Sequence, residues 1–579
     1  MLSSLETKEV PSVPSRGARR VALRWGATAG TIILLIAVGA WVRLLPHMSY
    51  YPIPGVYRAY SVYDILHILR TGHEIRQGEA GPVTSYSTGV YLGTQDILRH
   101  KVDASVILLL GLDRGDLQAY YRYGLWSPLV VVPLAIFALY SALARARGRP
   151  TGYRGLLLVA FAVLGSFSMI SVTFHGETNT ATGWSFMLMA LYGLVRIREA
   201  PVGGRVLFFV FCALLVMLYH TSAILLVSCV VVLAIWTLVR GGRHAPYTHS
   251  LTTLLVIAVL VLAYFMYVSV SYFDFLSRTL TKAPSLIIYL LRQQGGTSPG
   301  SVLADLLAPG PPAFPYEMLA LALLVAVPVA GVFLVAVRGR LTRLCGLQAT
   351  NVLFPWLLGL IPFSLGLFIW NGISGLEWKL GEFGSLFSLI ALSCLLAAPL
   401  ARRLTAALTI LVIVCMVLST VMYYTYNRNG PSYLTYAEEE AGTWLAERAG
   451  PREVVFTDLR LAMPLIVHDH LMVVGINDYE RPRTVRRWLE AIYYGSDARA
   501  AQAALDEIWV PAGTQMRYAL FSQRAERDLP GIKGYDYNFR GAPAGYTRKF
   551  LSLPGWSLVY DNGTVQIFEL PNQRSDHAR

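Results

Sequence analysis

The chain has 579 residues, of which 55% are hydrophobic and 15% are charged, and its mean hydropathy is +0.49. A soluble globular protein carries about 25% charged residues, so this composition excludes an ordinary soluble fold. The net charge of +14 does not indicate nucleic-acid binding, because the chain from Arg428 onward is almost neutral, with 18 Lys+Arg against 19 Asp+Glu.

Long apolar runs recur through the first three quarters of the chain and predict a polytopic α-helical membrane protein. Residues 1–25 are polar and basic, and we expect them to form a disordered cytoplasmic tail that lacks a signal-peptide pattern. After them we predict about eleven transmembrane helices, at 27–45, 124–144, 155–174, 183–195, the two halves of 206–239, 251–270, 316–337, 350–370, 385–400 and 404–424.

Arginine clusters in the short loops predict the orientation of these spans in the cell membrane. With the N-terminus in the cytoplasm, eleven spans place the C-terminal domain outside, and the arginine clusters then fall on the cytoplasmic side. The sequence therefore divides into a cytoplasmic tail (1–25), a transmembrane domain (26–424) with a long outer loop at 46–123, and a small extracytoplasmic α/β domain (425–579).

The C-terminal domain alternates predicted helices and strands and ends in a hairpin. The stretch WSLVYDNGTVQIFEL predicts two strands joined by a turn at Asn562-Gly563, and this turn explains the matching glycosylation sequon without a modification. The other predicted elements are helices at 438–448, 460–467, 481–494 and 497–507 and strands at 453–457 and 471–476. None of the five cysteines falls in this domain, so we expect no disulfide framework.

The long outer loop contains the stretch AYSVYDILHILRTGHEIRQG, residues 59–78. Its polar residues recur at helical spacing opposite a face of isoleucine and leucine, which is typical of an amphipathic helix lying in the membrane interface. Asp64 stands at the start of this helix, where a lipid headgroup meets water, and is our best catalytic candidate. An aspartate there would equally serve as a helix N-cap, and the sequence leaves both readings open.

Other polar residues fall in the predicted outer loops, where a functional site is expected. His175 and Glu177 stand two residues apart between the third and fourth spans, and with a carboxylate from elsewhere they would suit a divalent cation. A solvated loop is the alternative. His220, in the turn at 219–222, and Lys379, in the last membrane loop, are candidates for binding a lipid phosphate, and Arg292 is a rival ligand.

The sequence contains no nucleotide-binding Gly-rich loop, no Walker motif and no Ser-centred nucleophile elbow. Transfer of a sugar from a lipid phosphate needs none of them. It needs a carboxylate that deprotonates the acceptor and a cation that stabilises the leaving phosphate.

The chain resembles GT-C membrane glycosyltransferases, which use polyprenyl-phosphate-linked sugars. The features that carry the resemblance are an acid ahead of an interface helix, a long outer loop after the first span, many spans and an outer C-terminal domain. YDILHILRTGHEI is similar to the acid-bearing segment of oligosaccharyltransferase catalytic subunits, and HGET falls where that family has its second metal motif. The resemblance implies that Asp64 is catalytic and, with His175 and Glu177, holds a divalent cation (Mg²⁺ or Mn²⁺).

The sequence departs from the oligosaccharyltransferases in the outer domain. Their WWDYG motif is absent, and the corresponding stretch here reads EVVFTDLRLAM. Protein N-glycosylation is therefore not expected, and the departure also puts metal dependence in question, since many relatives work without metal.

The leading hypothesis is an inverting glycosyltransferase that moves a sugar from a polyprenyl phosphate to a glycan, lipid or protein acceptor on the outer face. Asp64 would be the general base, His175 and Glu177 would position a metal or the acceptor, and Lys379 or His220 would bind the phosphate. One alternative is a transporter or flippase of lipid-linked sugars. Transporters tend to have internal repeats, and the sequence shows no clear one. The other is a non-catalytic cell-envelope scaffold with the C-terminal domain as its binding module.

Overall fold

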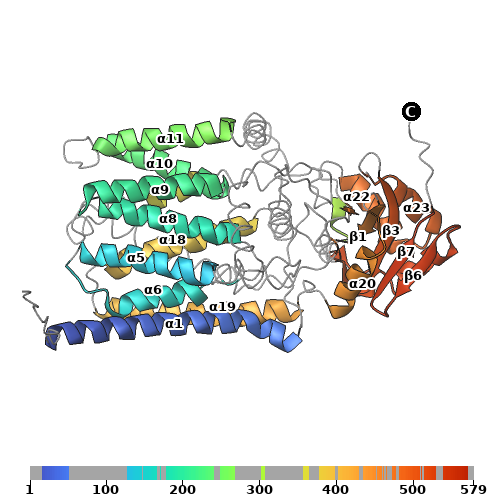
Figure 1. Ribbon diagram of the computed structural model, residues 1–579, viewed down its shortest axis with the longest axis horizontal. Coiled ribbons are helices and arrows are strands. Elements are labelled where there is room, and N and C mark those ends of the chain that lie inside the picture. Colours follow the sequence, from blue (N-terminus) through green and yellow to red (C-terminus); the bar gives the residue numbers. More distant parts are fainter. Residues whose placement is uncertain are drawn as a thin grey trace, which may run out of the picture.

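The computed structural model consists of a bundle of apolar helices with an α/β domain at one of its ends (Figure 1). It describes residues 16–50, 127–146, 148–165, 170, 178–197, 199–218, 220–239, 248–267, 302–306, 356–363, 377–397, 402–429, 435–450, 453–458, 461, 465, 472–476, 482–508, 510, 514–529 and 539–571.

The described helices of the bundle coincide with predicted spans. They are α1 (Arg16–Tyr50), the π-helical turn η1 (Ser127–Val131) that leads into α5 (Val132–Arg145), α6 (Gly152–Leu164), α8 (Thr178–Arg196), α9 (Pro201–Leu218), α10 (His220–Val239), α11 (Thr248–Tyr267), α18 (Glu377–Ala397) and α19 (Arg402–Asn429). Among the described residues, Gly26–Arg43 and Arg402–Met422 are long and apolar enough to cross a membrane, and six further helices are apolar but shorter. The total of eleven spans stays a prediction.

Several predicted boundaries were wrong because helices extend further into polar sequence than their apolar runs do. The helix α1 already begins at Arg16, so residues 16–25 are helical and not disordered. The helix α8 begins at Thr178, inside the predicted loop 175–182, and α18 begins at Glu377, inside the predicted loop that ended at 384. Helical backbone satisfies its own hydrogen bonds, so a helix gains by continuing past the hydrocarbon boundary.

The helices α8 and α9 form a tight hairpin in the bundle. Pro201 is the first residue of α9, where its missing N–H costs nothing. Gly193 lets the two backbones approach, because a Cβ atom there would lie 2.7 Å from the backbone nitrogen of Phe208. Trp184, Phe208 and Trp356 are completely or almost completely buried in the core that these helices share with their neighbours.

Large apolar side chains also lie exposed on the outer faces of the bundle, on α1, α9, α10, α11 and α19. Contiguous exposed apolar surface on this scale is what contact with lipid tails requires. Four of the five cysteines (Cys212, Cys229, Cys394 and Cys415) are buried in α9, α10, α18 and α19 and form no disulfide, and Cys345 lies outside the described residues.

The C-terminal domain is built on a five-stranded mixed sheet in the order β2-β1-β3-β7-β6. Its helices and strands are α20 (Tyr436–Ala446), β1 (Glu453–Thr457), β2 (Met472–Val474), α22 (Pro482–Leu489), η3 (Glu490–Tyr494), α23 (Ala498–Asp506), β3 (Gln515–Ser522), η4 (Gln523–Glu526), β4 (Asp528–Leu529), β5 (Phe539–Arg540), η5 (Tyr546–Ser552), β6 (Ser557–Asp561) and β7 (Val565–Glu569). The strand β1 runs parallel to β2 and β3, and the β3–β7–β6 part is antiparallel.

The predicted hairpin is confirmed. Its strands β6 and β7 pair antiparallel, and Gly563 adopts a left-handed conformation with φ 78° at the turn. The side-chain oxygen of Asn562 accepts hydrogen bonds from the backbone N–H groups of Thr564 and Val565, at 3.1 and 2.9 Å. The predicted strand 453–457 matches β1, whereas the sequence analysis missed β3, which lies at the centre of the sheet.

A segment of the predicted outer loop 271–315 belongs to the core of this domain. Leu303 and Leu306 are buried in the apolar cluster that also contains residues of α22, β1 and β3. The backbone N–H of Arg540 donates to the carbonyl of Leu306 at 2.9 Å. The guanidinium of Arg486 on α22 donates to both carboxylate oxygens of Asp305, at 2.8 and 2.6 Å. The segment 302–306 and the domain therefore lie on the same side of the bundle.

We predict that Leu303→Ala destabilises the C-terminal domain, although Leu303 lies more than 100 residues before it in the sequence. Removing a fully buried leucine side chain costs about 2–5 kcal/mol. Urea-dependent pulse proteolysis of the detergent-solubilised full-length chain measures this loss. Leu551→Ala, at a position that is 58% exposed, is the control and is expected to change stability by less than about 1 kcal/mol. Equal midpoints for both variants would contradict the assignment of 302–306 to the domain core.

The π-helical turn η3 is contacted at its end by Lys549. Lys549 Nζ donates to the carbonyl oxygens of Ala491 and Gly495, at 2.9 and 2.6 Å. These carbonyls lie at the C-terminal end of the turn, where cations are favoured. Burial lowers the pKa of Lys549 from its ordinary value of 10.5 to about 8.

The lowered pKa of Lys549 predicts a pH dependence of domain stability. Between pH 8 and 10 the unfolded chain holds the proton of this lysine more tightly than the folded domain does, so the free energy of unfolding rises with pH. We expect Lys549→Met to remove this rise and Arg548→Met to keep it, since arginine does not titrate in this range. Pulse proteolysis in urea at several pH values checks both. An unchanged pH slope in Lys549→Met would contradict the assignment.

Candidate functional site

Chain connections define which end of each bundle helix faces the C-terminal domain. The helix α19 ends at Asn429 and α20 begins at Tyr436, so the C-terminal end of α19 lies at the end of the bundle that we call the domain-facing end (Figure 1). At the opposite end, Arg154 in the first turn of α6 donates to the carbonyl of Leu396 at 2.9 Å and to the hydroxyl of Thr405 at 3.2 Å. The end of α18 and the start of α19 therefore lie together there.

The same reasoning places three helix N-termini at the domain-facing end. The helix α18 ends at the opposite end, so it begins at the domain-facing end. Only Tyr219 separates α9 from α10, and α8 joins α9 through residues 197–200 at the opposite end (Figure 1). The N-terminal ends of α8, α10 and α18 therefore all lie at the domain-facing end of the bundle.

Two of the predicted phosphate ligands are positioned by these N-terminal ends. His220 is the first residue of α10, not part of a turn, and Lys379 lies in the first turn of α18, not in a loop. Both predictions of local structure were therefore wrong, but the two backbone positions lie at the same end of the bundle. Arg292 lies outside the described residues.

The three residues predicted for catalysis and metal binding also lie outside the described residues. Asp64 falls within residues 51–126, which separate α1 from η1, and His175 and Glu177 directly precede Thr178, the first residue of α8, in sequence. Within the part of the chain that the structure describes, no three His, Cys, Asp or Glu side chains gather as a metal site would require. The assignments of Asp64, His175 and Glu177 stay predictions.

The exposed backbone groups at a helix N-terminus make the domain-facing end suited to anions. A helix N-terminus carries about half a positive charge and up to four unpaired N–H groups. The first turns of α8 and α10 contain no acidic residue that would neutralise this charge, whereas α18 begins with Glu377. Phosphate binds readily in such a field.

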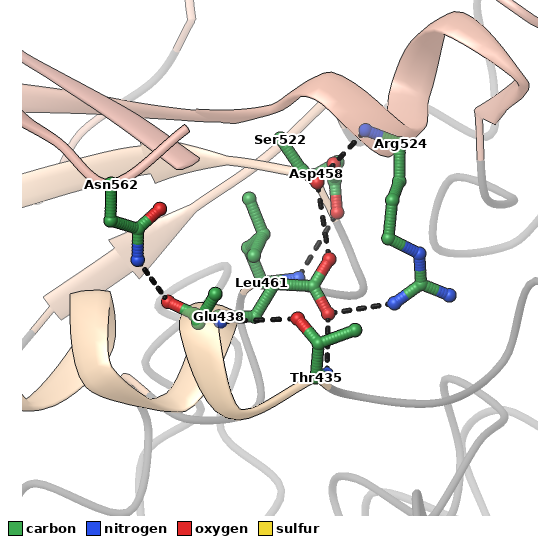
Figure 2. Close-up of polar contacts among 8 residues, drawn as sticks. Thr435, Glu438, Asp458, Leu461, Ser522, Arg524 and Asn562 are labelled. Atoms are coloured by element: carbon green, nitrogen blue, oxygen red, sulfur yellow. Dashed lines mark hydrogen bonds and ion pairs between the residues drawn. The ribbon is translucent and has the colours of Figure 1, made fainter. Parts of the chain in front are cut away.

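On the domain side, a buried carboxylate organises the start of α20 (Figure 2). Thr435 and Glu438 form a capping box: the Thr435 hydroxyl accepts from the N–H of Glu438 at 3.3 Å, and the Glu438 carboxylate accepts from the N–H of Thr435 at 2.8 Å. The carboxylate is fully buried and also accepts from the hydroxyl of Ser522 at 3.1 Å and from Arg524 Nη1 at 2.7 Å.

Further hydrogen bonds tie this cluster to the sheet. Asp458, directly after β1, accepts from the N–H of Leu461 at 3.0 Å, and Asn562 of the hairpin turn donates to the carbonyl of Ala437 at 2.8 Å. The cluster therefore fastens α20, which follows α19, to the end of β3 and to the hairpin turn between β6 and β7. The cluster was not predicted, although the Thr435-x-x-Glu438 spacing is the signal of a capping box.

The fold is similar to that of GT-C membrane glycosyltransferases, which confirms the resemblance at the level of the fold. The oligosaccharyltransferase AglB from Archaeoglobus fulgidus, in complex with an inhibitory peptide and a dolichol-phosphate, has a TM-score of 0.54 at 12% identity over 86% of this chain and 69% of its own. Another structure of the A. fulgidus enzyme, with Zn and sulfate, has a TM-score of 0.52 at 10% identity, over 86% of this chain and 68% of its own.

Two further structures match nearly the whole chain. ArnT from Cupriavidus metallidurans matches over 94% of this chain and 98% of its own, with a TM-score of 0.50 and 14% identity. The arabinofuranosyltransferase AftD from Mycobacteria matches over 93% of this chain but 40% of its own, with a TM-score of 0.51 and 16% identity. No protein-family model and no curated protein matches the sequence.

We predict that Glu438→Gln strongly destabilises the start of the C-terminal domain. The change leaves the guanidinium of Arg524 without its buried counter-charge, and breaking a buried ion pair costs about 3–5 kcal/mol. Glu490→Gln removes an ion pair of similar length, 2.9 Å, whose carboxylate is 47% exposed, and is expected to cost less than about 1 kcal/mol. Pulse proteolysis of both full-length variants in urea measures the difference, and similar losses would show that the Glu438 cluster is not a structural anchor.

Proposed function

We propose that the chain is an inverting membrane glycosyltransferase that takes a sugar from a polyprenyl phosphate and passes it to an acceptor on the outer face of the cell membrane. The observation that carries the proposal is the fold shared with AglB and AftD, which extends over both the bundle and the C-terminal domain. A fold alone does not determine chemistry, which depends on the residues of the site.

The domain-facing end supplies what transfer from a lipid phosphate needs. In the proposed reaction the bond between the sugar C1 and the phosphate oxygen breaks, a bond from C1 to the acceptor oxygen forms, and the acceptor proton passes to a base. The polyprenyl phosphate leaves with the electron pair of the broken bond. The N-termini of α8 and α10 and Lys379 in α18 are proposed to provide positive charge at this end for the leaving phosphate, and His220 a hydrogen-bond donor.

Asp64 is the proposed general base. It belongs to the segment between Tyr50, the last residue of α1, and Ser127, the first residue of η1. A carboxylate in that segment can receive the acceptor proton at the membrane surface. Arg292, with His220 and Lys379, is proposed to bind the lipid phosphate.

A divalent cation such as Mg²⁺ or Mn²⁺ suits the donor set of two carboxylates and one imidazole that Asp64, Glu177 and His175 provide. When bound, it would neutralise negative charge on the phosphate. His175 and Glu177 are also proposed to position the acceptor.

The bundle is proposed to have its domain-facing end outside the cell and its N-terminus in the cytoplasm. The arginines of the short connections support this orientation, since Arg145, Arg154, Arg196 and Arg402 all lie toward the end opposite the domain.

We predict that Asp64→Asn lowers sugar transfer by about 100-fold or more, because a positioned general base contributes about 10²–10⁴-fold to the rate. Purified protein in lipid vesicles is assayed with a panel of polyprenyl mono- and diphosphate sugars. The control is Asp103→Asn, a second aspartate of the same outer loop, which is expected to leave transfer unchanged.

Gel filtration and thermal unfolding of both variants establish that they are folded. Near-normal turnover of folded Asp64→Asn protein would remove Asp64 as the base. Movement of the lipid-linked sugar across the vesicle membrane without any transfer would favour a flippase instead.

A further inference from the structure

A buried arginine lies where α1 reaches the domain-facing end of the bundle. Arg43 is only 1% exposed, although it falls within the apolar span Gly26–Arg43. Its Nη1 donates to the carbonyl of Gly39, and its Nη2 donates to the carbonyl of Val163 in α6, both at 2.9 Å. A charge buried at this depth is costly, so its place calls for a physical reason.

The end of α6 provides that reason. Val163 lies in the last turn of α6, where the carbonyl groups carry the negative end of the helix dipole. The guanidinium of Arg43 supplies both a donor and a positive charge there. From the other side, the hydroxyl of Ser419 on α19 donates to the carbonyl of Gly165, the C-cap of α6, at 3.2 Å. Side chains of α1 and α19 therefore donate hydrogen bonds to carbonyl groups at the end of α6.

The backbones meet closely at the same point. A Cβ atom on Gly39 would lie 2.2 Å from Val163 Cγ1 and 3.2 Å from a methyl carbon of Leu129 in η1. Leu129 is 1% exposed and Val163 is equally buried, and both belong to one small apolar cluster with Leu164 and Ile170. Three parts of the chain, α1, η1 and α6, are thus packed together at Gly39, one turn before Arg43.

These three parts border the sequences that carry the proposed catalytic groups. The helix α1 precedes residues 51–126, which contain Asp64, and η1 follows them. The end of α6 precedes His175 and Glu177, and α8 follows them at once. The guanidinium therefore joins α1, which precedes the Asp64 sequence, to the end of α6, which precedes the His175 sequence.

We infer that Arg43 is a positioning residue: it holds the ends of α1, η1 and α6 together and thereby sets the relative positions of the two catalytic sequences. This role rests on the proposed function for its catalytic consequence, but the clamp itself is a property of the described residues. A planar fork that reaches two carbonyls of different helices suits arginine and not lysine.

The first test compares Arg43→Met with Arg154→Met. Arg154 makes the same kind of bond between helices, from α6 to the carbonyl of Leu396, but at the opposite end of the bundle. Hydrogen exchange of the full-length chain in lipid nanodiscs is read over 127–131 and 161–165. We expect exchange there to be at least tenfold faster in Arg43→Met and unchanged in Arg154→Met. Unchanged exchange in folded Arg43→Met overturns the inference.

The second test is kinetic. We expect Arg43→Met to lower kcat at least tenfold with KM changed less than twofold, because displacement of catalytic groups by about 1 Å can cost about 100-fold in rate. Arg43→Lys should recover part of the rate, and Arg154→Met should turn over at the wild-type kcat per folded molecule. Equal losses in Arg43→Met and Arg154→Met would overturn the positioning role.

A substitute variant and a readout that does not need activity allow the tests to decide in every case. If Arg43→Met does not fold, Gly39→Ala takes its place, since its added methyl separates α1 from α6 while the charge remains. If the wild-type protein transfers no sugar, the proposed function fails but hydrogen exchange still decides whether Arg43 clamps the three chain ends: faster exchange at both places supports the clamp, and unchanged exchange overturns it.

Discussion

The constraint on which this structure depends is that helix ends buried away from water must find partners for their last carbonyl groups. Arg43 meets this need at the buried end of α6, and Arg154 and Lys549 make the same kind of bond at the half-buried ends of α18 and η3. In each case a long cationic side chain from a different element reaches the carbonyl. The same bond therefore satisfies a backbone group, opposes the helix dipole and joins two elements that are distant in sequence.

Joining distant elements matters most between the bundle and the C-terminal domain. The chain passes from α19 into α20 through a short connection, and Glu438 fastens the start of α20 to β3 through Ser522 and Arg524. A second link comes from the segment 302–306, whose leucines lie in the domain core and whose Asp305 binds Arg486. Two separate parts of the transmembrane sequence thus enter the domain, so movement of the domain would be transmitted to both.

The sequence predicted the elements whose signals are local. Apolar runs located the helices, strand 453–457 was correct, and Asn562-Gly563 identified the hairpin turn. Boundaries such as Thr178 and Glu377 were missed because polar residues continue a helix once tertiary packing supports it. The strand β3 and the burial of Leu303 depend on partners far away in sequence, and no local pattern carries that information. Glu438 was overlooked as an anchor because its role depends on Arg524, 86 residues later.

The predicted site shows the same division. Sequence placed His220 and Lys379 on one side of the membrane, and the helix directions put both at the domain-facing end. What the sequence did not reveal is the charge balance there. Arg43 offsets the negative C-terminal end of α6, while the N-termini of α8 and α10 have no acidic residue in their first turns to offset them. These two N-terminal ends therefore favour a bound anion, although α18 begins at the same end with an acidic residue, Glu377. A lipid phosphate has the charge that such a surface binds.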